Sequence, residues 1–390
     1  MLTRRDMLKM SAAGAASVGL AGSMVKNVYA DEHRNIVPPA NFVPQHDAKG
    51  LYKYKFSDSE KRSLPGGWAR EATVKQFPIS EGIAGVDMTL EAGAVRELHW
   101  HAIAAEWAFM ISGKARITII DPEGTSEVAD FSAGDVWYFP KGFGHSIQAL
   151  EGGAHFILTF DNGHFSEFGT FSITDWITHI PKEVLSKSTQ LPASIFSKVK
   201  QGEAYIVSGR VPPALPLAKN DGGRSDSPLK HHYPMMSKPP FFENDAGSVH
   251  LVSSKEFPVS KTITGVVEII KPGAVRELHW HPNANEWQYY LQGKGRMTVF
   301  SSHGHAQTEE YAKSDVGYVP QGFGHYIENI GDEDLKVLVV LDNGIYQDIS
   351  LSDWLAKTPS YLLADNFNTT EEAWSDRPQE KLVISRGKQD

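Results

Sequence analysis

The sequence predicts an all-β protein with two related barrels, each followed by a short helical segment. The main observation is an exact internal repeat, because residues 93–101 and 273–281 both read GAVRELHWH. Further matches keep the same offset of 180, including residues 142–145 and 322–325, which both read GFGH. Both copies contain short alternating or apolar runs separated by Gly, Pro or Asp. Such runs are typical of closed β structures, and a duplication of this length is rarely accidental.

The first 30 residues resemble a twin-arginine export signal. Arg4 and Arg5 precede a small, apolar run at 10–22 and a candidate cleavage site at 28–30. The run is too short to span a bilayer permanently, and an ordinary surface helix is the alternative interpretation. The resemblance implies an exported protein, periplasmic or secreted, that reaches its destination folded and with its metal.

Composition excludes several classes of function. Hydrophobic residues make up 41% of the 390 residues, which is enough for packed cores. The net charge of −9 becomes −12 once residues 1–30, with four basic residues and one acidic residue, are removed. An acidic chain without a basic run is a poor partner for nucleic acid or for an anionic membrane. The chain has no cysteine, which excludes disulfides, thiolate chemistry and cysteine-based metal sites.

The chain divides into six segments by composition. After the export segment, we expect an arm at 31–70, a first barrel domain at 71–190 and a proline-rich linker at 191–240. A second barrel domain at 241–365 and a polar tail at 366–390 complete the chain. Strands are expected at 115–120 and 136–139, and short helical segments at 175–185, interrupted by Pro181, and at 353–363.

Each repeat carries a set of metal-binding residue types in the same register. His99 and His101 are two apart, so both imidazoles project to one face of a strand. Glu106 and His145 follow, and could complete a site of three imidazoles and one carboxylate for a first-row divalent metal. Exposed or core histidines are the alternative, but they do not explain why the same set occurs twice. The second copy repeats the set as His279, His281, Glu286 and His325.

These residues belong to a recognisable pattern. Gly93-x5-His99-x-His101-x4-Glu106-x6-Gly113, followed by Gly134-x5-Pro140-x-Gly142-x2-His145, resembles the two cupin motifs, and the second copy has the same spacing. The chain thus resembles a bicupin, which implies two double-stranded β-helix, or jelly-roll, barrels. Two departures concern turns only: Ala149 replaces the usual Asn, and Ser314 replaces a Gly.

Between about residues 40 and 375 the chain is similar to the bacterial oxalate decarboxylases. The similarity is carried by residues 66–71, 96–101, 137–140, 145–150 and 286–290. It implies oxalate as the substrate and one manganese per barrel, two per chain, held by three histidines and a glutamate. It also implies a homo-oligomer, either a trimer or a hexamer of stacked trimers. Iron, cobalt or zinc would also suit such ligands.

The resemblance places Arg96 in the metal pocket, where it would bind a carboxylate of the substrate. Strand alternation alone would turn Arg96 away from His99 and put Glu97 beside the ligands. A pocket position therefore requires an irregular backbone between Arg96 and His99. The alternative is a surface ion pair with Glu97 or a neighbouring residue, and the same argument applies to Arg276.

A mobile lid with a general acid is also implied by the resemblance. Glu167 aligns with the lid glutamate, but Phe168 and Gly169 stand where the decarboxylases have Asn and a small hydroxyl residue. The matching stretch of the second copy, residues 345–348, has no Ser-Glu pair. We therefore expect the first site to be the catalytic one.

The resemblance implies an enzyme that converts oxalate to formate and carbon dioxide, with manganese and dioxygen as cofactors and Glu167 as the proton donor. Oxalate oxidase, which yields carbon dioxide and hydrogen peroxide, is the nearest alternative because of Phe168 and Gly169. A non-catalytic storage or binding bicupin and an enzyme for another acid remain further alternatives, since the fold hosts many functions.

Overall fold

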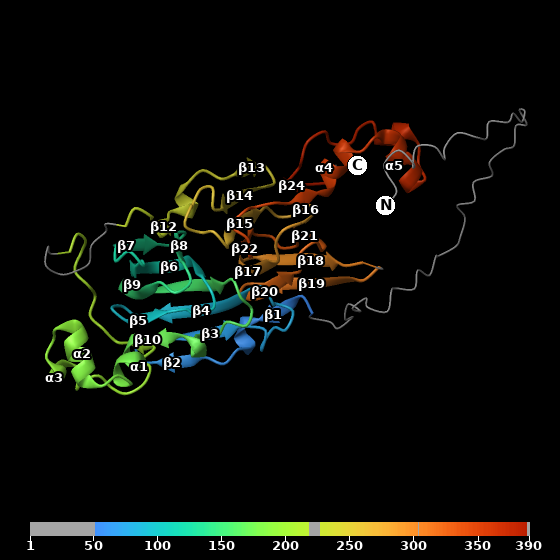
Figure 1. Ribbon diagram of the computed structural model, residues 1–390. Coiled ribbons are helices and arrows are strands. Elements are labelled where there is room, and N and C mark those ends of the chain that lie inside the picture. Colours follow the sequence, from blue (N-terminus) through green and yellow to red (C-terminus); the bar gives the residue numbers. More distant parts are fainter. Residues whose placement is uncertain (1–50, 218–226, 303, 388–390) are drawn as a thin grey trace, which may run out of the picture. The chain divides into compact units, whose positions relative to one another are not determined.

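The computed structural model describes residues 51–217, 227–302 and 304–387, all within one compact unit, residues 45–390 (Figure 1). The export segment predicted at 1–30 lies outside the described residues, as do parts of the predicted arm, linker and tail. No helix in the described ranges is long and apolar enough to cross a bilayer.

The first barrel is formed by one continuous antiparallel sheet, which is held together by two long strands, β6 and β9. The main path runs β12-β8-β6-β9-β4-β3-β2, while β5 pairs with β9, β10 and β11, and β7 pairs with β6. The strands are β2 (Arg62–Leu64), β3 (Gly67–Ala72), β4 (Ala84–Leu90), β5 (Val95–Trp100), β6 (Glu106–Ile120), β7 (Ser126–Ser132), β8 (Val136–Phe139), β9 (Gly144–Phe160), β10 (Phe171–Ser172), β11 (Ile206–Val207) and β12 (His232–Tyr233).

The second barrel repeats this arrangement with two separate sheets, because shorter strands replace the long ones. The sheets run β1-β20-β17-β22-β15-β14-β13 and β19-β18-β21-β16-β23, and β24 pairs with β16. The strands are β1 (Lys53–Lys55), β13 (Phe242–Asn244), β14 (Gly247–Val252), β15 (Thr264–Ile270), β16 (Val275–Trp280), β17 (Glu286–Gln292), β18 (Lys294–Phe300), β19 (Ala306–Ala312), β20 (Asp315–Val319), β21 (Gly324–Asn329), β22 (Leu335–Leu341), β23 (Ile349–Ser350) and β24 (Ile384–Ser385).

Short helices follow each barrel. They are α1 (Ile173–Thr178), α2 (Lys182–Thr189), α3 (Ala193–Phe196), α4 (Leu351–Lys357) and α5 (Ser360–Phe367), with four 3-10 turns at η1 (Phe56–Asp58), η2 (Glu167–Gly169), η3 (Met235–Ser237) and η4 (Glu371–Trp374). Ser172 and Ser350 cap α1 and α4 by accepting hydrogen bonds from the amides of Asp175 and Asp353. Pro181 separates α1 from α2. The predicted fold class, two barrels with short helical segments, is confirmed.

Apolar side chains fill both barrels and also the contact between them. Each barrel has its own buried cluster, and a third cluster contains residues from both copies, such as Trp107, Ile157, Trp287 and Leu338. Strand β1, from the predicted arm, pairs with β20 of the second barrel. The two barrels are therefore packed as one body around a shared core.

Two segments that lack strand-like periodicity nevertheless pair with the strands that carry the first histidines. In the predicted linker, β11 pairs with β5, and in the predicted polar tail, β24 pairs with β16. Tyr205 and Val383, just before these strands, both have left-handed backbone with φ of 60° and 61°. Description as a polar tail was therefore wrong for the residues around Val383. Their pairing is a backbone interaction, which side-chain composition does not reveal.

Candidate metal centres

The structure brings the four predicted ligands of each copy together inside the barrel. In both sets the candidate ligand atoms lie within 4.8 Å of one another, and every residue is buried. His101 Nε2 lies 3.0 Å from Glu106 Oε2, and His281 Nε2 lies 2.8 Å from Glu286 Oε2. Two atoms bonded at right angles to one ion at about 2.1 Å would be about 3 Å apart. The spacing therefore suits atoms that share a metal ion.

Hydrogen bonds behind the imidazoles leave the Nε2 atoms available as ligands. His99 Nδ1 lies 2.5 Å from the Glu97 carbonyl oxygen, and His145 Nδ1 lies 2.8 Å from that of Phe143. Because a carbonyl can only accept, Nδ1 carries the proton and Nε2 keeps its lone pair. In the second copy, His279, His281 and His325 also face carbonyl oxygens through Nδ1. The donor set fits a divalent metal in both barrels.

Each glutamate ligand is oriented by a neighbouring side chain. Trp137 Nε1 donates to Glu106 Oε1 at 2.9 Å, whereas Gln288 Nε2 donates to Glu286 Oε1 at 2.6 Å. The two donors occupy opposite sides of equivalent residue pairs. In the first barrel Trp137 faces Ala108, and in the second Gln288 faces Gly317. The donor is thus Trp137 of β8 in the first barrel and Gln288 of β17 in the second. In both barrels it holds the glutamate carboxylate in place.

Burial controls the charge of the imidazoles. It lowers the pKa of His99 well below its ordinary value, and the positive charge of Arg96 acts in the same direction. The same two causes, burial and then Arg276, lower the pKa of His279. Both rings are therefore neutral near pH 7, as metal ligands must be.

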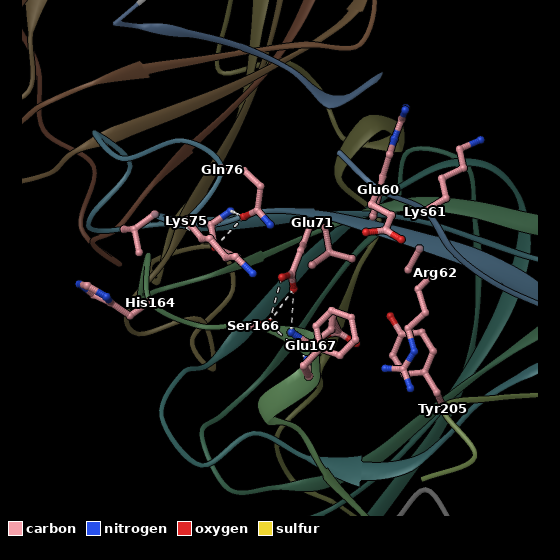
Figure 2. Close-up of a pocket in the computed structure, with 16 residues that line it drawn as sticks. Glu60, Lys61, Arg62, Glu71, Lys75, Gln76, His164, Ser166, Glu167 and Tyr205 are labelled. Atoms are coloured by element: carbon pink, nitrogen blue, oxygen red, sulfur yellow. Dashed lines mark hydrogen bonds between the residues drawn. The ribbon is translucent and has the colours of Figure 1, made fainter. Parts of the chain in front are cut away.

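A cavity of about 730 Å³ lies beside the first site and is bounded by the predicted lid (Figure 2). Its lining includes Ser166, Glu167 and Phe168 of the lid and Arg62 and Glu71 of the strands opposite. Phe168 is exposed, whereas Glu167 is buried. The lid thus separates this cavity from the metal-ligand cluster.

Arg96 lies inside the site. The resemblance to the decarboxylases implies this position, whereas regular strand alternation would turn Arg96 away from His99. A register shift between Arg96 and His99 in the pairing of β5 with β9 supplies the irregular backbone. The Arg96 side chain is 1% exposed, which rules out a surface ion pair. Glu97 points elsewhere, and accepts hydrogen bonds from the amide of Tyr205 and from Thr174 Oγ1 at 2.5 and 2.6 Å. Arg276 is placed in the same way by a matching shift on β16.

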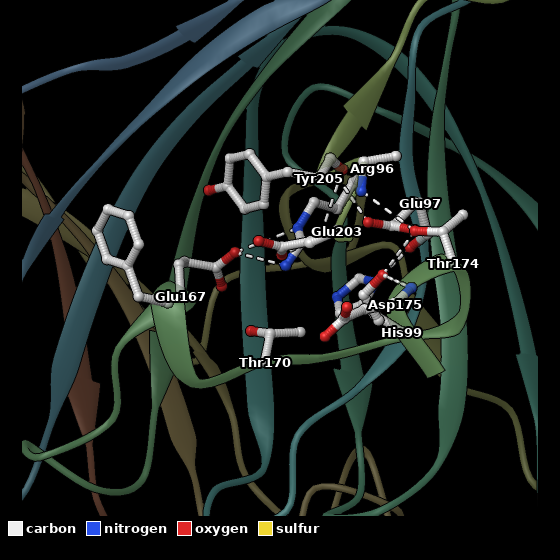
Figure 3. A network of polar contacts seen from close by, with 12 residues as sticks. Arg96, Glu97, His99, Glu167, Thr170, Thr174, Asp175, Glu203 and Tyr205 are labelled. Carbon is white, nitrogen blue, oxygen red and sulfur yellow. Dashed lines mark hydrogen bonds and ion pairs between the residues drawn. The ribbon is translucent and has the colours of Figure 1, made fainter. Parts of the chain in front are cut away.

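Arg96 is paired with the lid carboxylate (Figure 3). Its Nε and Nη2 both donate to Glu167 Oε2, at 3.1 and 2.8 Å. Nη1 donates to the Tyr205 carbonyl at 3.3 Å and lies 3.8 Å from Glu203 Oε1. The Tyr205 ring contacts two guanidinium groups, with its centroid 3.7 Å from that of Arg62 and 4.1 Å from that of Arg96. Sequence reasoning missed Tyr205 and Glu203, because they belong to the predicted linker.

Arg276 has a different set of partners. Its Nε donates to Glu268 at 3.0 Å and its Nη2 donates to Asp348 at 2.8 Å, and both carboxylates are nearly inaccessible to solvent. Lys381, from the C-terminal segment, also pairs with Asp348. The residue that corresponds to Glu268 in the first barrel is Met88. The second arginine is thus neutralised by two buried carboxylates, whereas the first pairs with one carboxylate on the lid.

The two copies also differ in the length of the segment that covers the site. Seven residues, 164–170, join Gly163 to β10 in the first barrel, and four residues, 345–348, join Gly344 to β23 in the second. The three extra residues in the first barrel make the lid, including turn η2. The signal is present in the sequence as a change of the offset from 181 to 178 across this segment.

Comparisons with known proteins agree with this geometry. The model of the cupin family matches residues 55–195 and 235–374. Oxalate decarboxylase of Bacillus subtilis is 48% identical over 324 residues, which cover 83% of each chain. A probable oxalate decarboxylase of Arthroderma benhamiae is 38% identical, covering 85% of this chain and 82% of its own.

A solved structure of the Bacillus subtilis enzyme, from work on its Mn(II) centres, superimposes with a TM-score of 0.83 at 44% identity. It covers 90% of this chain and 92% of its own length. Full-length similarity in sequence and structure, together with two intact ligand sets, identifies the chain as a member of the cupin family and, within it, of the bicupin oxalate decarboxylases.

Proposed function

We propose that this chain converts oxalate to formate and carbon dioxide at the first metal site, with manganese bound in both barrels. The observation that carries the proposal is the buried pair of Arg96 and Glu167 beside a complete set of three histidines and one glutamate. The relatives named as oxalate decarboxylases and the Mn(II) centres of the solved Bacillus subtilis enzyme support the substrate and the metal.

The first manganese would be held by His99, His101, Glu106 and His145. When bound, it would supply, with dioxygen as a co-catalyst, the one-electron redox chemistry that weakens the carbon–carbon bond of oxalate. The second set would hold a manganese ion in the same way, and its neutralised Arg276 favours a supporting role over substrate binding.

Arg96 is suited to bind the substrate because it already binds a carboxylate. Glu167 Oε2 takes both hydrogen bonds of the guanidinium edge, as a carboxylate of oxalate would. Binding of oxalate to Arg96 would therefore displace Glu167. The exchange leaves the charge next to Arg96 unchanged and releases the lid carboxylate for a second task.

That second task is proton delivery. Hydrogen oxalate contains the same atoms as formate plus carbon dioxide, so the net reaction moves one proton from a substrate oxygen to the remaining carbon. Glu167 is nearly buried, and its Oε1 has no hydrogen-bond partner among the described residues. A carboxylate that is shielded from water and free on one oxygen can take up the acidic proton of the substrate and return it to the remaining carbon.

Oxalate oxidation is the second candidate function. Oxalic acid and dioxygen would yield two molecules of carbon dioxide and one of hydrogen peroxide if the proton is not delivered to carbon. Phe168 is 72% exposed, and a Cβ on Gly169 would have no neighbour within 4 Å. Few contacts hold this half of the lid, and this observation favours some oxidase activity.

We also propose that the protein is exported by the twin-arginine route and forms a homo-oligomer. The export segment supports the first proposal. Exposed apolar side chains in both copies support the second, since each copy presents a leucine and aromatic or aliphatic partners to solvent. These are Leu98, Phe171 and Trp176 in the first copy and Leu278, Ile349 and Trp354 in the second.

The test is to incubate the manganese-loaded protein with oxalate under air at about pH 5 and to quantify formate and peroxide together. Formate equal to the oxalate consumed, and lost in Glu167→Ala, is the expected result. Peroxide in place of formate would assign oxidase activity. Neither product would leave a metal-binding bicupin with another substrate or none. Exclusion of dioxygen should stop turnover if dioxygen is a co-catalyst.

A further inference from the structure

The lid over the first site is held from outside by one carboxylate, that of Glu71 on β3. Ser166 Oγ donates to Glu71 at 3.0 and 2.9 Å from the two carboxylate oxygens, and the amide of Glu167 donates to Glu71 Oε2 at 3.0 Å. Figure 2 shows Glu71 reaching across the cavity to these two residues. Both hydrogen-bond donors belong to the lid, and one of them is the backbone amide of Glu167, the proposed proton donor.

The position of these contacts determines where the Glu167 side chain can point. With its amide bound to Glu71 on the cavity side, Glu167 directs its carboxylate inward to Arg96. Ser166 in turn accepts a hydrogen bond from the amide of Phe168, so the start of turn η2 is tied to the same carboxylate. The remaining contacts of the lid tip are weaker. Examples are the Phe168 ring 5.0 Å from the Arg62 guanidinium and Thr170 Oγ1 3.4 Å from His101 Nδ1.

The second barrel provides an internal comparison. Strand β14 corresponds to β3, and Leu251 stands where β3 has Glu71. The segment that covers the second site lacks the three extra residues and has Gln347 and Asp348 in place of Ser166 and Glu167. The carboxylate on the strand and the Ser-Glu pair on the lid are thus present together in one copy and absent together in the other. A general structural role of this strand position would not require such a match.

We propose that Glu71 is a positioning residue that latches the lid closed, with Glu167 directed into the site while the proton is delivered. The inference rests on the proposed function for its effect on products, but not for its effect on lid motion. When the latch opens, the Glu167 amide and the Ser166 hydroxyl lose their shared acceptor and the carboxylate can swing out of the site. Loss of Glu71 should then raise the share of oxalate that ends as peroxide.

The experiment compares Glu71→Ala, Glu71→Gln, Ser166→Ala and the double variant Glu71→Ala/Ser166→Ala in the full-length, manganese-loaded protein. Glu60→Gln is the matched control, because Glu60 is an exposed carboxylate that lines the same cavity. It removes one negative charge there without touching the latch. Two readouts are needed: hydrogen exchange of the peptide that covers residues 163–170, and the ratio of formate to peroxide with kcat and KM.

In Glu71→Ala, lid amides should exchange about 10-fold faster, since two hydrogen bonds to a charged group are lost. kcat for formate should fall and the peroxide share should rise, with KM changed less than kcat. Glu71→Gln, which keeps one acceptor oxygen, should lie between wild type and Glu71→Ala. The effect of the double variant should be smaller than the sum of the two single effects, because both substitutions remove the contact between Ser166 and Glu71. Glu60→Gln should match wild type.

Unchanged lid exchange and product ratio in Glu71→Ala would overturn the proposal, as would an equal effect of Glu60→Gln. Additive effects of the two single variants would also overturn it. If Glu71→Ala does not fold, Glu71→Gln and Ser166→Ala provide the same test. A wild-type protein that forms no formate would refute the proposed function alone, because the exchange measurement would still decide whether Glu71 holds the lid.

Discussion

Two arginines with the same nine-residue context have different electrostatic surroundings. Arg96 and Arg276 are both 1% exposed and follow the same backbone irregularity. The first pairs with Glu167 of the lid segment, and the second pairs with Glu268, which lies on a strand, and with Asp348. Residues outside the repeat therefore decide which arginine can exchange its partner for a substrate.

Substitution of the two arginines should give opposite patterns. Arg96→Gln should lower kcat/KM for oxalate by about 100-fold or more, because a bidentate charged contact to the substrate is lost. Arg276→Gln should keep oxalate binding at the first site but leave Glu268 buried without its cationic partner, at about 3–5 kcal/mol, whereas Asp348 keeps Lys381. Steady-state kinetics and thermal unfolding of both variants check this. A kinetic defect confined to Arg276→Gln would reverse the assignment of the catalytic site.

The pH dependence of the free energy of unfolding should reveal the protonation of Glu268. Burial raises the pKa of Glu268 above its ordinary value of 4.5, although Arg276 acts in the opposite direction. As the pH falls through the raised pKa toward 4.5, the folded state binds a proton that the unfolded chain does not, so this group stabilises the fold on acidification. That stability is lost again as the pH rises through the folded pKa.

The measurement for Glu268 compares the wild-type protein with Glu268→Gln, both stripped of metal, by urea unfolding between pH 7 and pH 4.5. As the pH falls, the free energy of unfolding of the wild type should increase relative to that of the variant, because the variant has no carboxyl to protonate. A difference that is constant with pH, or that moves the other way, would contradict the raised pKa.

At the scale of residues, the sequence was sufficient to predict the metal ligands but not the residues that contact Arg96 beside them. The eight ligands share a register that the repeat makes visible, and strand periodicity predicts their common face. Tyr205 and Glu203 could not be found in this way, because the segment that contains them matches its counterpart at 381–385 mainly in backbone conformation. Glu203 even has the opposite charge to Lys381 at the equivalent position.

The lid is the element in which the two halves differ most. Its first half is anchored by Phe165, which is buried and stacks on Phe160 with ring centroids 3.7 Å apart. Its second half contains Phe168 and Gly169, which are exposed. An anchored start and a loosely held end are suited to a segment that opens and closes about the first site.

Gly169→Ala should favour the closed lid. The backbone at Gly169 does not have positive φ, and an added Cβ would meet no atom within 4 Å. Alanine has fewer open conformations than glycine, a difference of about 0.4–1 kcal/mol, which corresponds to a shift of about two- to fivefold toward the ordered state. The peroxide share should fall and hydrogen exchange of the lid should slow. Faster exchange would show that the closed lid cannot accept the methyl group.

Elements with a side-chain period could be predicted, and elements held by backbone pairing alone could not. The expected strand at 136–139 matches β8, and the helical segment interrupted by Pro181 appears as α1 and α2. In contrast, β11 and β24 are two residues long and lie in proline-rich or polar surroundings. No periodicity can be read from two residues, so their roles in closing the sites became visible only in three dimensions.

For the whole molecule, the duplication produces two metal sites on a shared support. The ligand sets are buried in separate barrels, and the intervening cluster joins side chains from both. Metal bound at either site should therefore stabilise the other barrel as well. We expect about two manganese ions per chain and a single unfolding transition.

Removal of the metal tests this coupling. Chelation should lower the unfolding temperature, because an ion that binds only the folded state stabilises it by mass action. His279→Ala should reduce the content from about two manganese ions per chain to about one and lower the unfolding temperature of the protein as a whole. Metal analysis and calorimetry provide the measurements. Two separate transitions, with only one affected by His279→Ala, would show that the barrels unfold independently.

The contact between the barrels depends on a reciprocal exchange of tryptophan and glycine. A Cβ on Gly85 would lie 2.3 Å from the Trp287 ring, and a Cβ on Gly265 would lie 2.1 Å from the Trp107 ring. Neither glycine has positive φ, so space alone requires glycine at these positions. Each tryptophan is fully buried and rests on the strand of the opposite copy. This arrangement makes the shared core sensitive to a single methyl group.

Gly85→Ala and Gly265→Ala should therefore destabilise the protein, against the usual effect of replacing glycine in a strand by alanine. Displacing a packed indole costs about 1–3 kcal/mol. Gly169→Ala, where an added methyl group meets open space, is the control and should not lower the unfolding temperature. Because the tryptophans belong to opposite barrels, either core variant should lower the stability of both, and the manganese sites should lose affinity together. Calorimetry measures the stability of the three variants, and metal titration measures their affinity for manganese. A loss of stability or affinity confined to the barrel that carries the substitution would mean that the shared core does not couple the two halves.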